Sequence, residues 1–151
     1  HTYIERAQML RLARLMPIST RPFVLIAFYS GMRRAEIARA EPTEKGWLLE
    51  DTKNGERRIV PIHPRTAHLA RNWPRSVSLN TMQHHFRAAA NAVGLEGLRF
   101  HDLRHSTASA LLAASVDLYT VGGILGHKST QSTKRYAHLS GGAMAKAIGA
   151  L

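Results

Sequence analysis

The chain has 151 residues and carries 21 Lys plus Arg against 10 Asp plus Glu, a formal net charge of +11. This length suits one domain, and the basic excess favours a polyanionic partner, most often nucleic acid. Cysteine is absent, which excludes a disulfide framework and a thiolate metal site. The longest apolar run, residues 23–29, is far shorter than the ~20 residues that span a bilayer, so we expect no membrane association. The chain begins with His1 rather than Met, so we expect it to be a piece of a longer protein.

Two helices are predicted before the first glycine. Thr2 and Glu5 have the spacing of a capping box and are expected to begin a helix that runs to about Met16. The second helix is apolar on all sides over residues 23–28, so it should lie at the centre of the core. Gly31 follows it as a helix-stop residue.

A short helix around Glu36 is predicted directly after Arg33 and Arg34. An arginine presented at the end of a buried helix is held by backbone packing, unlike an ordinary surface arginine.

Residues 47–49 and 58–62 are predicted to be short strands. Asn54 and Gly55 between them are a two-residue hairpin turn signal. Lys53 comes just before this turn, where a long cationic side chain can reach beyond the edge of the sheet.

The remainder of the chain is predicted to be helical. His84 and His85 lie on one of these helices without a matching partner pattern, and we interpret them as structural or surface residues. Asp117 is expected to cap a helix that Gly126 closes. The predicted helices cover residues 64–71, 80–93, 101–114 and 117–125, a segment that starts at 129 or 130 and carries Tyr136, and a short tail within 140–151 that packs elsewhere.

One polar cluster opens the helix at His101. His101 and His105 have the four-residue spacing of a helical zinc site, but Asp102 stands where that site needs a Glu as general base. Arg104 lies between them, and its fixed positive charge would repel a dication. Because Arg binds planar oxyanions through two parallel hydrogen bonds, the cluster favours a phosphate or phosphoryl site over zinc.

Tyr136 follows the Gly126-His127-Lys128 cluster by nine positions. A phenol with a pKa near ~10 becomes a useful nucleophile only beside a base, or beside cations that favour the phenolate. The neighbouring basic residues and histidines supply both kinds of group, so Tyr136 is a candidate nucleophile.

Taken together, these motifs resemble the tyrosine recombinase, or phage integrase, family. The resemblance runs along most of the chain, and its motifs occur in the family's order. They are the first arginine box at 30–37 with Arg33, the hairpin lysine Lys53 followed by 58–62, the H-x-x-R box with His101 and Arg104, the third box at 125–129 with His127, and the nucleophile box at 135–138 with Tyr136.

The resemblance implies an α+β fold that is mainly α-helical, with a small three-stranded antiparallel sheet whose first strand lies near 39–42. It also implies a single catalytic domain over 1–151, without the family's amino-terminal core-binding domain. Gly122 and Gly123 depart from the expected pattern, so that helix is expected to be locally mobile.

The activity implied by the resemblance is breakage and rejoining of DNA through a 3′-phosphotyrosyl intermediate, with no metal, ATP or other cofactor. Tyr136 would be the nucleophile and Lys53 the acid that protonates the leaving 5′ oxygen. Arg33 and Arg104 would stabilise the phosphate charge, His101 would be the base toward Tyr136, and His127 a hydrogen-bond donor. Further DNA contacts are predicted at Arg34, Arg57, Lys128, Lys134 and Arg135.

The expected partner is double-stranded DNA, bound in the cytoplasm by a homotetramer of the full-length protein, with this fragment a monomer. Alternatives from other classes are a non-catalytic DNA-binding module and a metal-dependent nuclease, although carboxylates are scarce near the histidine clusters. A type IB topoisomerase shares the chemistry and differs in lacking strand exchange. The sequence leaves open the DNA site and the choice among phage integration, excision and chromosome-dimer resolution.

Overall fold

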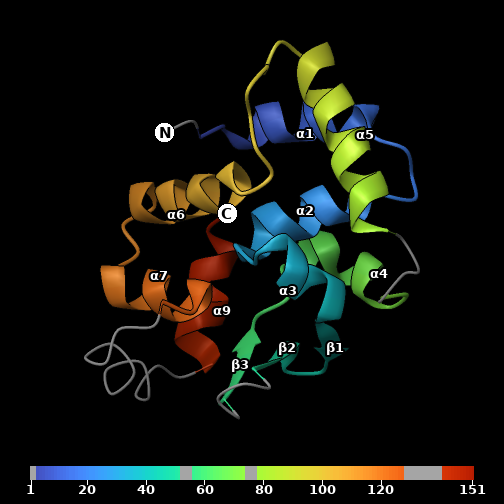
Figure 1. Cartoon of the computed structure of the whole chain (residues 1–151). Helices are drawn as coiled ribbons and strands as arrows, with labels where there is room; N and C mark the ends of the chain where they lie inside the picture. Colours follow the sequence, from blue (N-terminus) through green and yellow to red (C-terminus); the bar gives the residue numbers. More distant parts are fainter. Residues whose placement is uncertain (1–2, 52–55, 74–77, 128–140) are drawn as a thin grey trace.

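The structure is a computed structural model, and residues 3–51, 56–73, 78–127 and 141–151 are described. Helices surround the central helix α2, and a small sheet lies at one end of the molecule (Figure 1). The predicted α+β, mainly helical fold is confirmed. No helix among the described residues is both long enough and apolar enough to cross a membrane.

Helix α1 spans Arg6–Leu15, so the predicted start at Thr2 is wrong. The cap lies at Glu5, whose N–H donates to Gln8 Oε1 at 2.9 Å. Ile4 explains the later start, because its side chain is buried and its N–H donates to Ser106 Oγ, 2.9 Å away. This contact ties Ile4 to α6, and Glu5 keeps an extended backbone with φ of −85° and ψ of 163°, so α1 begins at Arg6.

Helix α2, Arg21–Ser30, is buried along almost its whole length, as its apolar sequence predicts. It packs against α1, α3 (Arg34–Arg39) and α6 (Asp102–Ala113). Gly31 ends it in the left-handed conformation, with φ of 74°. Arg33 therefore follows directly after a buried helix, and its side chain lies at the surface.

The sheet has the order β1-β2-β3 and is antiparallel throughout. Its strands are β1 Glu41–Thr43, β2 Gly46–Asp51 and β3 Glu56–Val60. Trp47 is paired with Val60, and both side chains are buried. Strand β3 ends at Val60 rather than at 62, since Pro61 follows and has no N–H for the ladder. The predicted turn, including Lys53, lies outside the described residues.

The carboxyl-terminal half is helical at the predicted places. Ser78 caps α5 by accepting hydrogen bonds from Asn80 and Thr81 N–H, and Asp117 caps α7 by accepting from Thr120 N–H. The predicted helix around Tyr136 lies outside the described residues. The elements are η1 Pro64–Thr66, α4 Ala67–Ala70, α5 Leu79–Ala92, α6, α7 Leu118–Leu125 and α9 Gly141–Gly149.

Candidate active site

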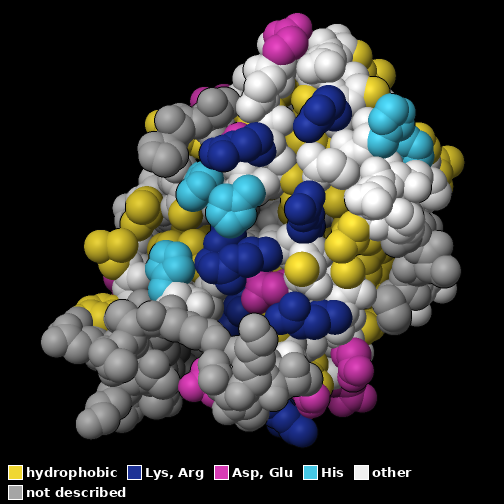
Figure 2. Space-filling view, in the orientation of Figure 1, with side chains coloured by type: hydrophobic (Ala, Val, Ile, Leu, Met, Phe, Trp, Pro, Cys, Tyr) yellow, Lys and Arg dark blue, Asp and Glu magenta, His cyan; other side chains and the backbone are white. Residues whose placement is uncertain are grey.

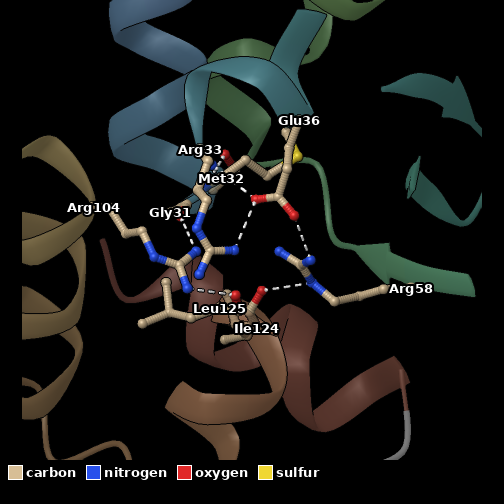
Figure 3. Close-up of polar contacts among 9 residues, drawn as sticks. Gly31, Met32, Arg33, Glu36, Arg58, Arg104, Ile124 and Leu125 are labelled. Carbon is tan, nitrogen blue, oxygen red and sulfur yellow. Dashed lines mark hydrogen bonds and ion pairs between the residues drawn. The ribbon is translucent and has the colours of Figure 1, made fainter. Parts of the chain in front are cut away.

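Arg33 and Arg104 come together at the point where α2 and α7 end and α6 begins (Figure 3). Arg33 stands at the N-cap of α3, and 49% of its side chain is exposed. Arg104 belongs to the first turn of α6 and is only 5% exposed. Its Nη1 donates to the carbonyl oxygen of Gly31 at 2.9 Å, and its Nη2 to that of Leu125 at 2.7 Å.

The two carbonyl groups that hold Arg104 are those that a helix leaves without partners at its carboxyl end. Gly31 is the C-cap of α2, and Leu125 is the last residue of α7. The planar guanidinium contacts both with fixed geometry, which a lysine ammonium does not reproduce. The carboxyl ends of two helices, α2 and α7, thus orient one buried cation.

Several charges act on Arg104. Burial is the largest cause that lowers the pKa of Arg104; with the charges of Arg33 and Arg58, and against an opposing effect of Glu36, it brings this pKa to about 10. Arg104 therefore stays protonated at neutral pH, although a second and a third guanidinium lie close to it.

Glu36 is the carboxylate of this cluster and is 6% exposed. Its Oε1 accepts a hydrogen bond from Arg33 N–H at 2.9 Å and lies 3.8 Å from Arg33 Nη1. Its Oε2 accepts from Arg58 Nη1 at 2.8 Å. Burial by itself raises the pKa of Glu36, but the hydrogen bond and charge of Arg58, followed by Arg33, bring it below its usual value. Glu36 is thus an ionised bridge between two arginines.

Sequence reasoning missed Arg58 and Glu36 as members of the site. Arg58 was interpreted only as a strand residue, yet it is two positions from the buried Val60 and so faces the same side of the sheet. Glu36 follows Arg33 by three positions, which on a short helix brings a carboxylate back toward the N-cap. Strand alternation for Arg58 and the three-residue helix spacing for Glu36 are the sequence signals that could have placed these two residues in the site.

His101 and His127 both feel the charges of Arg104 and Arg33. Burial is the largest cause that lowers the pKa of His101, followed by the charges of His105, Arg104 and Arg33. For His127, burial again comes first, followed by Arg104, Arg33 and Arg58. Both lowered pKa values favour neutral imidazoles at pH 7, the form that can accept a proton.

The His101 and His105 rings meet edge to face, with centroids 5.0 Å apart and an interplanar angle of 86°. Asp102 lies between them in sequence but is buried, and its Oδ2 accepts a hydrogen bond from Arg99 N–H at 2.8 Å. Asp102 therefore fixes the start of α6. Within the described parts of the chain, no three His, Asp or Glu side chains form a group that could hold a metal ion.

The structure therefore brings Arg33, Arg104, His101 and His127 together, while their individual roles stay predictions. Lys53 and Tyr136 lie outside the described residues, and so do the predicted DNA contacts Lys128, Lys134 and Arg135. Figure 2 shows Lys, Arg and His side chains gathered on the face that carries this cluster.

The two described DNA-contact candidates lie in different places. Arg34 is exposed beside the site, where its Nη1 donates to Gln83 Oε1 at 3.0 Å. Arg57 is also exposed and pairs with Glu50 at 3.3 Å. Because successive side chains of a strand point to opposite faces, Arg57 faces away from the side that Arg58 occupies.

The comparisons with known proteins agree with this geometry. The phage integrase family matches residues 3–142. The chain is 27% identical over 138 residues to the tyrosine recombinase XerC of Corynebacterium glutamicum, a match that covers 76% of this chain and 45% of that protein. The chain spans less than half the length of the curated relatives it matches.

Two solved structures share the fold. The integrase from mycobacterium phage Brujita superimposes with a TM-score of 0.78 at 24% identity, over 100% of this chain and 59% of that one. The XerH site-specific recombinase bound to difH substrate has a TM-score of 0.68 at 20% identity, over 97% of this chain and 53% of that one. With the family match over almost its whole length, this chain belongs to the phage integrase family.

Proposed function

We propose that this chain is the catalytic domain of a site-specific DNA recombinase, which breaks and rejoins DNA through a covalent phosphotyrosyl intermediate at Tyr136. The observation that best supports the proposal is the pairing of Arg33 with Arg104. One guanidinium is half exposed and the other is buried and fixed by two helix-end carbonyls. Such a pair is suited to a phosphodiester, whose non-bridging oxygens accept hydrogen bonds from two sides.

In the proposed reaction the Tyr136 hydroxyl oxygen attacks the phosphorus of the scissile phosphodiester and forms a 3′-phosphotyrosyl bond. The bond from phosphorus to the 5′ oxygen breaks. His101 accepts the phenolic proton, and Lys53 donates a proton to the leaving 5′ oxygen, since an alkoxide is a poor leaving group. Rejoining is the reverse step with a 5′-hydroxyl as nucleophile, so the bond energy is retained and no ATP is consumed.

Positive charge has to appear where the transition state becomes more negative. Arg33 and Arg104 supply it at the non-bridging oxygens, and His127 donates a further hydrogen bond there. Glu36 neutralises part of the charge of the free site, which lets several guanidiniums lie close together before DNA arrives. These guanidiniums take the place that metal ions occupy in many nucleases.

The proposed substrate is duplex DNA, in line with the net charge of +11 and the basic face in Figure 2. XerH, a protein of the same fold, has been solved with its difH substrate. We propose that full-length protein acts as a homotetramer on two duplexes in the cytoplasm. Here Ala147 and Ile148 of the tail helix α9 are buried, and α9 packs on α7 of its own chain.

A nicked suicide duplex tests this proposal, because the short fragment released by cleavage diffuses away and traps the intermediate. Wild-type chain should form a covalent protein–DNA adduct that survives denaturing electrophoresis. Tyr136→Phe should form none, while its DNA affinity changes less than about twofold, since a single hydroxyl adds little to phosphate binding. Adducts at wild-type yield with the Phe variant would remove Tyr136 from the mechanism, and DNA binding without any adduct would favour a non-catalytic binding module.

A further inference from the structure

Arg58 has no role in the chemistry proposed above, yet from β3 it contacts two other elements that carry the site, α3 and α7. We propose that Arg58 is a positioning residue. It holds the Glu36 carboxylate, and through it the backbone N–H of Arg33, against the carboxyl end of α7 beside His127. This inference rests on the proposed function and adds to it a residue to which the proposed reaction gives no direct part.

The contacts of Arg58 define this role (Figure 3). On one side, Nη1 donates to Glu36 Oε2 on α3 at 2.8 Å. On the other, Nε donates to the carbonyl oxygen of Ile124 in the last turn of α7 at 3.3 Å. Arg58 itself is on β3, the strand that follows the segment containing Lys53. One side chain therefore joins the sheet to the first arginine box and to the end of α7, directly before the third box.

Gly126 leaves room for this guanidinium. A Cβ atom at position 126 would lie within 2.5 to 2.8 Å of three Arg58 guanidinium atoms, so any other residue would push Arg58 away. Gly126 also has φ of 73°, where a side chain is strained. The glycine before His127 is thus required both by the helix end and by Arg58.

The hydrogen bond from Arg58 to Glu36 affects Arg33 because Glu36 is buried and binds both arginines. Its Oε1 accepts from Arg33 N–H, while its Oε2 is held by Arg58. Without Arg58, a buried carboxylate loses its shortest charged contact and has to turn or draw in water. Either response moves the acceptor of Arg33 N–H, and a shift of about 1 Å in a catalytic group can reduce a rate roughly 100-fold.

Arg21 offers a matched structural control. It is also a half-buried arginine held by carbonyl oxygens, with Nε 2.9 Å from Ala13 O and Nη2 3.0 Å from Met16 O. It lies at the amino end of α2, whereas Arg33 follows the carboxyl end, and ten residues of helix measure about 15 Å. Arg21→Met should therefore cost stability without moving the site.

The test compares Arg58→Met and Arg21→Met in three measurements on the 151-residue chain. These are the single-turnover cleavage rate on the nicked suicide duplex, the duplex affinity by fluorescence anisotropy, and the ¹⁵N–¹H spectrum with the Arg33 amide assigned. Arg58→Met should slow cleavage about 10- to 100-fold and shift the Arg33 amide, with DNA affinity reduced less than about threefold. Arg21→Met should leave both the rate of the folded protein and the Arg33 amide as in wild type.

Two further variants keep the test decisive if Arg58→Met does not fold. Arg58→Lys retains the charge, but one nitrogen cannot serve both Glu36 and the Ile124 carbonyl, so the rate should lie between those of wild type and Arg58→Met. Glu36→Gln should slow cleavage as well, and adding Arg58→Lys to it should slow it little more, because both changes break the same bridge. Fully additive effects would mean that Arg58 does not act through Glu36.

The failure of this inference can be told apart from that of the proposed function. If wild-type chain forms adducts and Arg58→Met or Arg58→Lys cleaves at the wild-type rate, only the positioning role falls. An Arg33 amide that is unchanged in the Arg58 variants would overturn that role independently of activity. If wild-type chain forms no adduct, the proposed reaction falls and the role of Arg58 in it falls too.

Discussion

Arg104 donates a hydrogen bond from Nη1 to the carbonyl oxygen of Gly31, 2.9 Å away, so the second arginine of the site is held by the residue that ends α2. Arg33 follows Gly31 by only two residues and is the N-cap of α3. The backbone turn at Gly31 therefore links the position of the Arg104 guanidinium to the point where the Arg33 side chain leaves the backbone. This relationship makes the left-handed turn at Gly31 part of the site.

Gly31→Ala should destabilise the fold more than Gly94→Ala. Both glycines have positive φ, 74° and 76°, so both alanines bear the left-handed cost of about 1–2 kcal/mol. At Gly94 a Cβ meets nothing within 4 Å, whereas at Gly31 it collides with the Leu125 side chain. Overpacking should add about 1–3 kcal/mol at Gly31 alone. Urea unfolding measures the free energy of unfolding of the two variants. If both lose the same amount, the Leu125 side chain moves aside at no cost in stability.

Arg104→Lys should impair both stability and cleavage. A lysine keeps the charge but loses one of the two carbonyl hydrogen bonds, worth about 1.5–3 kcal/mol for a charged donor. The cleavage rate should fall about 100-fold or more, as expected when one donor to a transition-state oxyanion is displaced. Arg11→Lys, an exchange at an exposed position of α1, is the matched control and should match wild type. Full activity of Arg104→Lys would show that the planar fork is unnecessary.

Stability should decrease as the pH falls from 7.5 to 5.5. Burial is the main cause that lowers the pKa of His63, His101 and His127 below the ordinary value of 6.5. In this window the unfolded chain binds more protons than the folded chain, so the free energy of unfolding rises with pH and is lost as the pH drops through 6.5 toward the folded values. Glu36 stays ionised throughout, since its pKa is lowered below 4.5.

His63→Gln isolates one part of this pH effect. His63 is buried, and its Nδ1 accepts a hydrogen bond from Arg65 N–H at 3.0 Å, a contact that an amide oxygen can replace. The variant should lose less stability than wild type between pH 7.5 and 5.5 in urea titrations. An identical pH dependence in both proteins would assign the effect to other groups.

The role of Lys53 can be separated from that of the arginines by the leaving group. Lys53→Ala should be rescued by DNA with a bridging 5′ sulfur at the scissile position, because a thiolate leaves without a proton. Arg33→Ala and Arg104→Ala should not be rescued, as their proposed task is charge stabilisation at the non-bridging oxygens. If all three variants respond alike in cleavage assays, Lys53 is not the general acid.

Local signals were sufficient to predict most of the fold. The apolar run of α2, the cap Asp117, and the glycines after α2 and α7 act within a few residues, so the sequence displays them directly. The cap of α5 is Ser78, two residues before the predicted start at Asn80. The start of α1 was predicted wrongly because its cause is distant: Ile4 N–H donates to Ser106 Oγ, 102 positions away. Long-range hydrogen bonds of this kind leave no local pattern.

The candidate site divides in the same way. The residue types and order of the motifs pointed to Arg33, His101, Arg104 and His127 before any geometry was known. The bridge from Glu36 to Arg58 spans 22 positions, and that from Arg58 to Ile124 spans 66, so neither follows from spacing. Strand alternation alone could have separated Arg58 from its neighbour Arg57, and only the fold shows what Arg58 contacts.

The most direct measurement of the central claim is the chemical identity of the trapped intermediate. Wild-type chain is incubated with the nicked suicide duplex in excess EDTA, the adduct is digested with protease and nuclease, and the modified peptide is sequenced by mass spectrometry. The account predicts a 3′-phosphonucleotide attached to Tyr136, formed in EDTA at the same yield as without the chelator. A nucleotide on another residue, a 5′-phosphate linkage, or an adduct that forms only when Mg²⁺ is restored would contradict it.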